Sequence, residues 1–135
     1  MKPEALVKSQ IKEFLDHIEA YYIMPVPTGM GPKLLDFYVC WRGRFIAIEA
    51  KAPGAKATPL QRHELEKIKN AEGIAFEADS VWAAAVELES DIPDILRLRW
   101  QGQNDRFQVR QSKLREAKTQ VQKMRRAVVD RGGQV

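Results

Sequence analysis

Hydrophobic residues are most concentrated over residues 36–51, where two runs rich in aromatic and β-branched residues flank a single break at Arg42 and Gly43. Such runs are typical of strands, and a break of two residues is typical of a tight turn. The pattern predicts a β-hairpin with arms at 36–41 and 44–51. In this register the numbers of paired residues add to 85, so Asp36 faces Glu49. Lys51 lies two residues beyond Glu49, on the same face of its strand.

Elsewhere in the first 90 residues, the sequence predicts three helices, one further strand and one long loop. Apolar residues at helical spacing predict helices from Pro3 to about Tyr22, from Thr58 to about Glu72, and from about residue 80 to residue 90. Residues 74–78 read as a strand, and residues 23–35, with three prolines and two glycines, read as a loop. Helices and strands in this order favour an α/β fold with a mixed sheet.

The pattern changes near residue 91. Residues 95–100 and 106–110 alternate apolar and basic side chains around a polar break, which predicts a second hairpin. Ser112 then caps a final helix with an apolar stripe, formed by Leu114, Ala117, Val121, Met124 and Val128. We therefore expect a core at 1–90 and a basic C-terminal extension, hairpin plus helix, at 91–135. The stripe packs either on the core or on a second subunit.

Charge is divided unevenly between these parts. Residues 1–96 hold 11 Lys and Arg against 15 Asp and Glu, and residues 97–135 hold 11 against 3, for net charges of −4 and +8. A basic appendage on an acidic core is a common footprint of polyanion binding, although a solvated basic helix gives the same count. No apolar run is long enough to span a bilayer, and the N-terminus has no apolar signal region. A single cysteine, Cys40, which we expect to be buried, suggests a reducing, cytoplasmic setting.

The predicted hairpin brings together two carboxylates and one ammonium group. Asp36 and Glu49 repel each other if they face one another, and Lys51 lies beside them. A hard divalent cation relieves this repulsion, since Mg²⁺ binds one or two carboxylates together with water and phosphate oxygens. Mn²⁺ shares that preference for oxygen. A salt-bridged trio on a solvated sheet face is the alternative.

The residues around this trio resemble a known family. Asp36, then 12 residues, then Glu49-Ala50-Lys51, after a Gly-rich loop and before Thr58-Pro-Leu-Gln61, is similar to the PD-(D/E)XK nucleases. The order of motifs resembles the VRR-NUC domains, especially the small stand-alone ones of phages, over about residues 4–89. One departure is Leu35, which stands where the family name places a proline.

The resemblance implies a restriction-endonuclease-like core that hydrolyses DNA with Mg²⁺ or Mn²⁺. It assigns Asp36, Glu49, the backbone carbonyl of Ala50 and, from the first helix, Glu4 to the metal, and Lys51 to the attacking water. Glu4 also suits the positive end of the helix dipole. Gln61 would reach toward the site, but Thr58-x-x-Gln61 is equally a capping box with a purely structural purpose.

The resemblance further implies a preference for branched DNA such as four-way junctions, a homodimer, and a phage-infected or prophage-bearing cell. We expect contacts with DNA from eight residues: Thr28, Lys33, Lys56, Arg97, Arg99, Lys118, Arg125 and Arg126. The competing hypothesis is a non-catalytic nucleic-acid-binding protein on a nuclease fold. A third is an assembly protein whose terminal helix binds a partner helix.

Overall fold

The computed structural model describes residues 1–31 and 34–132. The chain divides into two compact units, with the boundary between Ile92 and Pro93. The first unit contains three helices and four strands: α1 (Pro3–His17), β1 (Tyr21–Ile23), β2 (Phe37–Trp41), β3 (Arg44–Ala50), α2 (Pro59–Asn70), β4 (Ile74–Ala78) and α3 (Val81–Glu87). The second unit is one helix, α4 (Asp94–Gly132).

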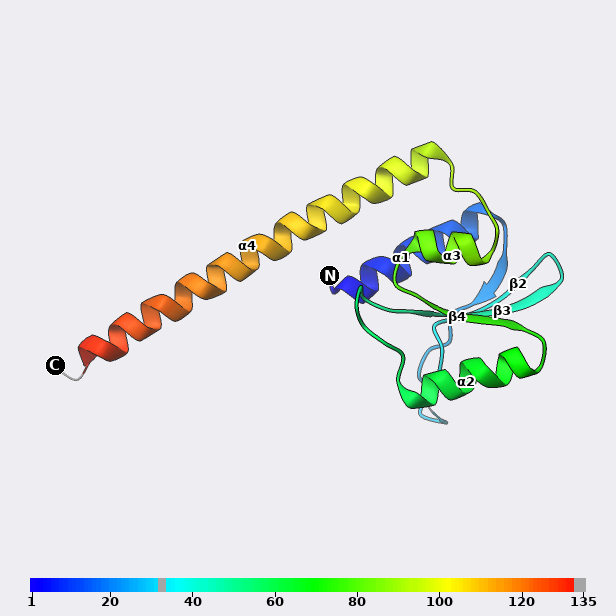
Figure 1. The fold of residues 1–135 in the computed structure, drawn as a ribbon, viewed down its shortest axis with the longest axis horizontal. Helices are drawn as coiled ribbons and strands as arrows, with labels where there is room; N and C mark the ends of the chain where they lie inside the picture. Colours follow the sequence, from blue (N-terminus) through cyan, green and yellow to red (C-terminus); the bar gives the residue numbers. More distant parts are fainter. Residues whose placement is uncertain (32–33, 133–135) are drawn as a thin grey trace. The chain divides into compact units, whose positions relative to one another are not determined.

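The first unit is built on a four-stranded mixed sheet with the order β1-β2-β3-β4. β1, β2 and β3 are antiparallel neighbours, whereas β4 runs parallel to β3. Figure 1 shows α1 and α3 on one face of the sheet and α2 on the other. Because helices cover both faces, every residue of β3 from Ile46 to Ala50 is buried. The predicted α/β fold with a mixed sheet flanked by helices is thus confirmed at this level.

The hairpin of β2 and β3 has the predicted register. Its pairs run from Phe37 with Ile48 to Trp41 with Arg44. Arg42 and Gly43 have φ angles of 53° and 74°, as a two-residue turn of the primed type requires. Asp36 precedes β2 and would form the next pair with Glu49. The turn therefore determines which residues meet at the far end of the hairpin.

Leu35, which replaces the proline of the resembled family, is fully buried. It lies in a core cluster on the α2 face of the sheet with Ala47, Leu65 and Ala75. An aliphatic side chain contributes roughly 1.5–3 kcal/mol when it is removed from water in this way. The residue before Asp36 thus serves packing in this protein.

Helix α1 ends earlier than predicted. It stops at His17, where Glu19 takes a φ of 60°, and Tyr21–Ile23 then form β1 instead of continuing the helix or entering a loop. Tyr, Tyr and Ile favour an extended strand, and the edge of β2 offers them partners from Tyr38 to Cys40. Cys40 is exposed, so the expectation of a buried cysteine is wrong. It follows buried Val39 and therefore points to the opposite face of the strand.

The predicted second hairpin is also wrong, because residues 95–110 belong to α4. The apolar stripe of the final helix extends backwards at spacings of seven, seven and four residues through Phe107, Trp100 and Leu96, all three of which are buried. This heptad spacing fits a helix as well as alternation fits strands, and Gly102 and Ser112 lie inside the helix without ending it. In the second half of α4 the stripe is exposed: Leu114, Val121, Met124 and Val128 are 46–68% accessible. Over residues 1–31 and 34–132, no helix combines the length and apolarity needed to cross a membrane.

Candidate functional site

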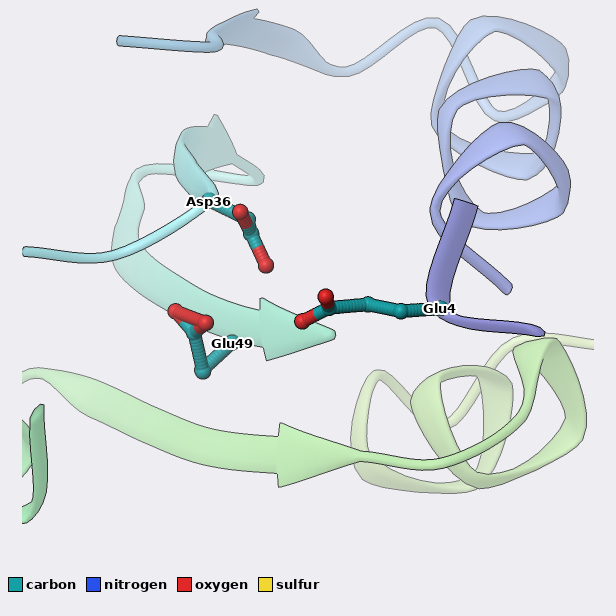
Figure 2. Close-up of side chains that lie close together, drawn as sticks. All are labelled: Glu4, Asp36 and Glu49. Carbon is teal, nitrogen blue, oxygen red and sulfur yellow. The ribbon is translucent and has the colours of Figure 1, made fainter. Parts of the chain in front are cut away.

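Three carboxylates from three different elements converge at one end of the sheet. Glu4 comes from the first turn of α1, Asp36 from the residue before β2, and Glu49 from the end of β3 (Figure 2). One carboxylate oxygen from each lies within 4.8 Å of the others. Such a group can hold a metal ion, because hard divalent cations bind several oxygen ligands at short range. The predicted convergence of Glu4, Asp36 and Glu49 is therefore found in the structure.

Asp36 is held in place by contacts to both of its oxygens. The backbone N–H of Ala50 donates to Oδ2 at 2.9 Å, and Nζ of Lys8 lies 2.8 Å from Oδ1. The side chain is only 4% exposed, so these contacts replace most of its hydration. Ala50 thus orients Asp36 through its N–H; its carbonyl remains a predicted ligand.

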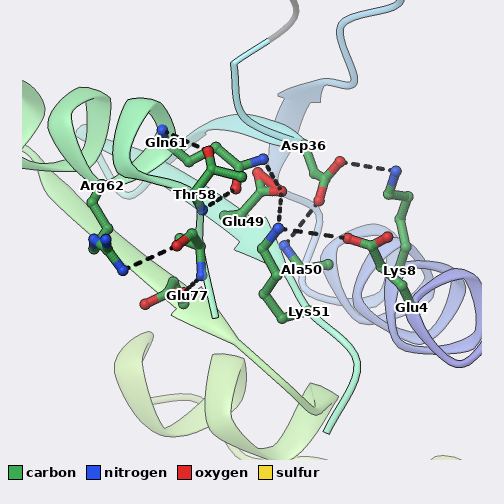
Figure 3. Close-up of polar contacts among 11 residues, drawn as sticks. Glu4, Lys8, Asp36, Glu49, Ala50, Lys51, Thr58, Gln61, Arg62 and Glu77 are labelled. Carbon is green, nitrogen blue, oxygen red and sulfur yellow. Dashed lines mark hydrogen bonds and ion pairs between the residues drawn. The ribbon is translucent and has the colours of Figure 1, made fainter. Parts of the chain in front are cut away.

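Glu49 is buried and incompletely satisfied. Its Oε1 accepts a hydrogen bond from Gln61 Nε2 at 3.1 Å and lies 3.5 Å from Lys51 Nζ (Figure 3). Its Oε2 is buried and has no hydrogen-bond partner among the residues that the structure describes. Leaving a buried charged oxygen unpaired is costly, and such an atom calls for an explanation such as an ion.

The surroundings of Glu49 disfavour its ionised form. Burial is the main cause that raises its pKa from 4.5 to about 7, and the neighbouring Asp36 carboxylate adds to this effect. The Lys51 ammonium opposes both. Near neutral pH the cluster without metal therefore retains a proton on Glu49 part of the time, and a cation of higher charge can replace that proton.

This shift predicts how the stability of the metal-free protein depends on pH. Because the folded-state pKa of Glu49 lies above the unfolded value, the folded protein binds more protons between these two values. The free energy of unfolding should therefore fall as pH rises from about 5 to 8, by at most about 3 kcal/mol. Urea unfolding in EDTA measures this slope. Glu49→Gln should flatten it, and an equal slope in that variant would assign the dependence to another group.

Lys51 lies one residue beyond β3, with its side chain 12% exposed. Its Nζ is 3.5 Å from Glu49 Oε1 and 4.0 Å from Glu4 Oε1, so it joins the carboxylates as predicted. The Lys51 N–H donates to the carbonyl of Ala78 at 2.9 Å, which continues the parallel ladder between β3 and β4. The backbone at Lys51 is thereby fixed while the ammonium group stays beside the cluster.

Gln61 performs both of the tasks that the sequence left open. Its Oε1 accepts the N–H of Thr58 at 2.9 Å, and its own N–H donates to Thr58 Oγ1 at 3.2 Å, which completes the capping box of α2. At the same time its Nε2 donates to Glu49. The partners define the amide orientation, because a backbone N–H only donates and a carboxylate oxygen accepts.

These two tasks can be separated by mutation. Gln61→Ala should cost about 1 kcal/mol of stability through the lost cap, and, for the nuclease expected from the resemblance, it should also lower DNA cleavage through the freed Glu49. Gln61→Glu keeps an acceptor for Thr58 and removes the donor to Glu49. We therefore expect near-normal stability with metal present but impaired activity. Wild-type cleavage by Gln61→Glu would mean that the contact with Glu49 has no role.

Sequence analysis missed Lys8 and a clamp at the start of α2. Lys8 follows Glu4 by four residues, so helical spacing alone would have placed both on one face of α1.

The clamp at the start of α2 holds the backbone of Ala57. Its N–H donates to Glu77 on β4, and its carbonyl accepts a hydrogen bond from Arg62 Nη1 at 3.1 Å. No local pattern indicates this clamp, since Glu77 is 20 residues from Ala57.

The residues expected to contact DNA are dispersed. Thr28 is exposed in the loop after β1, where its Oγ1 accepts the N–H of Met30 at 3.4 Å, and Lys56 is exposed between β3 and α2. Lys33 lies outside the described residues. The other five belong to the second unit and are exposed on α4: Arg97, Arg99, Lys118, Arg125 and Arg126. No protein-family model and no curated protein sequence matches this chain.

Proposed function

We propose that this protein is an endonuclease that hydrolyses DNA phosphodiester bonds with Mg²⁺ or Mn²⁺. The observation that carries the proposal is the buried pair of Asp36 and Glu49, which lies within 4.8 Å of Glu4 and beside Lys51. Burying two neighbouring carboxylates destabilises the folded protein unless cations compensate their charge. Residues that bind a metal ion are retained at functional sites despite this destabilisation. The sequence resemblance to VRR-NUC domains indicates the reaction that these four residues would support, which is metal-dependent hydrolysis of DNA.

Each residue has a role that its position supports. Asp36 and Glu49 provide buried oxygens for the cation, and Glu4, with a side chain 47% exposed, can complete the set from the solvent side. The bound cation would stabilise negative charge that develops on the phosphoryl and leaving oxygens. Lys51 orients the attacking water and stabilises the same charge from the protein side. Gln61 keeps Glu49 Oε1 in position.

A cleavage panel tests the proposed function and its substrate class together. Single-stranded, duplex, flap and four-way-junction DNA would each be incubated with Mg²⁺, Mn²⁺ and EDTA. We expect metal-dependent cleavage that is strongest on branched DNA. Salt-sensitive binding to all four without any cleavage would favour the non-catalytic nucleic-acid-binding protein instead. Absence of both binding and cleavage would leave the assembly protein.

The basic helix α4 is proposed to supply DNA affinity and to join two copies in a homodimer. Seven Lys and Arg against two Asp and Glu follow Gln111, and the exposed stripe lies among them. Each neutralised phosphate contributes about −0.9 to the slope of log affinity against log salt. Two such helices repel one another, so dimer formation should strengthen as salt rises while DNA binding weakens.

Deleting residues 112–135 is therefore expected to flatten the salt slope and to yield monomers. Val121→Asp should yield monomers with little change in the slope, because it removes an apolar contact but no cation. Thr119→Asp is the matched control, since it introduces the same charge on the opposite side of α4. Light scattering and binding titrations measure both properties. If Val121→Asp and Thr119→Asp have the same mass as the wild type, the stripe does not join subunits.

A further inference from the structure

Lys8 is positioned as a cation that compensates Asp36 in the metal-free protein. It follows Glu4 by one helical turn on α1, and its Nζ lies 2.8 Å from Asp36 Oδ1 (Figure 3). The lysine side chain is 30% exposed, whereas Asp36 is 4% exposed. The ammonium group thus lies at the boundary between the buried carboxylates and solvent.

The charges of the cluster show why this lysine matters. Three carboxylates (Glu4, Asp36 and Glu49) and two ammonium groups (Lys8 and Lys51) give a net charge of −1 when all are ionised. A divalent cation would change this to +1, and one phosphodiester would then balance it. A cation that binds Asp36 competes with Lys8 for the same carboxylate, so the lysine becomes able to pair with another anion. A phosphate of the substrate is the anion that arrives at that stage.

A groove beside the cluster offers a place for that phosphate. It follows α1, has a volume of about 340 Å³, and its lining includes Lys2, Glu4, Lys8, Ser9, Lys12 and Met24. Glu4 and Lys8 belong both to this groove and to the carboxylate cluster, so the two are continuous. Three lysines and one carboxylate line the groove, and two of the lysines, Lys8 and Lys12, pair with Asp36 and Asp16 outside it. Lysines in this position can contact the phosphates of a nucleic-acid backbone.

We propose that this groove along α1 binds the DNA backbone next to the cleaved bond, and that Lys8 exchanges Asp36 for a phosphate oxygen when the metal enters. The proposal rests on the proposed nuclease function and adds a DNA-binding surface that none of the eight expected contact residues shares. It also couples the two ligands. Metal releases Lys8 for DNA, and DNA stabilises the released lysine, so each ligand should strengthen binding of the other.

Lys8 and Lys12 should therefore behave differently although both line the groove. Lys12 lies one turn further along α1, 3.4 Å from Asp16, and has no contact with the cluster. Its pairing with Asp16 does not involve the cluster, so Lys12 should contribute equally to DNA binding with and without metal. Lys8 is engaged with Asp36 until metal arrives, so its contribution to DNA affinity should depend on metal.

The test uses four variants of the full chain. Lys8→Gln keeps a hydrogen-bond donor for Asp36 but removes the charge, and Lys8→Arg keeps both. Lys12→Gln changes the groove alone. Lys69→Gln is the outside control, since Lys69 lies on α2 and pairs with Glu66 at 3.3 Å. Metal affinity is measured by calorimetry with Mn²⁺ in the absence of DNA. DNA affinity is measured by fluorescence anisotropy with a labelled four-way junction, in EDTA and in Ca²⁺, with a gel to verify that the DNA stays intact.

We expect Lys8→Gln to bind Mn²⁺ about tenfold more tightly than the wild type, because the competing charge is gone. Its DNA affinity should be near normal in EDTA and about fivefold weaker in Ca²⁺. Lys8→Arg should restore wild-type binding of Mn²⁺. Lys12→Gln should bind Mn²⁺ normally and lose DNA affinity equally in both buffers, and Lys69→Gln should change neither.

Two results would overturn the inference. Unchanged Mn²⁺ affinity in Lys8→Gln would show that the lysine does not compete with the metal, and an equal loss of DNA affinity in both buffers would make Lys8 an ordinary backbone contact. If the wild type itself binds no Mn²⁺, the proposed function fails and not merely the role of Lys8.

Discussion

Replacing Glu49 with glutamine should reduce DNA cleavage at least a thousandfold while the protein remains folded. The change keeps the shape of the side chain but removes a charge from the centre of the cluster, where Glu49 is 3% exposed and lies beside Asp36 and Lys51. Asp36→Asn and Lys51→Met should have effects of similar size, because the proposed function assigns the three groups to one reaction, in which such losses do not add. Glu4→Ala should be milder, since that side chain is half exposed.

The same substitutions should leave stability intact, which separates them from mutations that merely unfold the protein. Without metal, Glu49→Gln relieves the repulsion by Asp36 and should hold or raise the urea midpoint at pH 8. Glu66→Gln, on the exposed surface of α2, is the control and should cleave normally. If Glu49→Gln cleaves DNA within tenfold of the wild-type rate in saturating metal, Glu49 is not required for the reaction.

The second large effect concerns metal and stability. Mn²⁺ at 100 times its dissociation constant should stabilise the wild type by about 2.7 kcal/mol, since the proposed metal site forms only in the folded protein. The double variant Asp36→Ala/Glu49→Ala should show no such gain. Thermal unfolding with a series of Mn²⁺ concentrations, with Ca²⁺ as a second hard cation, measures the shift. Equal shifts in both proteins would place the metal elsewhere in the chain.

The hairpin explains how much of the site could be predicted from the sequence. The register of a hairpin depends on its turn, and the local sequence at Arg42 and Gly43 is sufficient to predict that turn. Once it is placed, Asp36, Glu49 and Lys51 follow by counting. Gln61 was predictable as a cap for the same reason, because a capping box spans only four residues. The approach of Glu4 came from the resemblance alone.

The predictions are wrong where tertiary contacts determine the secondary structure, or where one segment fits two different hydrophobic periodicities. Tyr21–Ile23 form β1 because the edge of β2 is available for pairing, and the sequence of this short segment does not indicate that it pairs with β2. Residues 95–100 fit strand alternation and a heptad equally, and only the longer stripe through Phe107 to Leu114 favours the helix. Lys8 was missed although its spacing from Glu4 was visible, since a lysine on a helix is ordinarily a solvated residue.

Nicking of supercoiled plasmid DNA is the most direct test of the central claim. Wild-type protein and Glu49→Gln, purified identically, would be incubated with plasmid in Mg²⁺, in Mn²⁺ and in EDTA. The proposed function predicts that the wild type converts supercoiled plasmid to the open circle in either metal, that EDTA stops it, and that Glu49→Gln is inactive throughout. Equal nicking by both proteins, or nicking that persists in EDTA, would contradict a metal-dependent active site at Asp36 and Glu49.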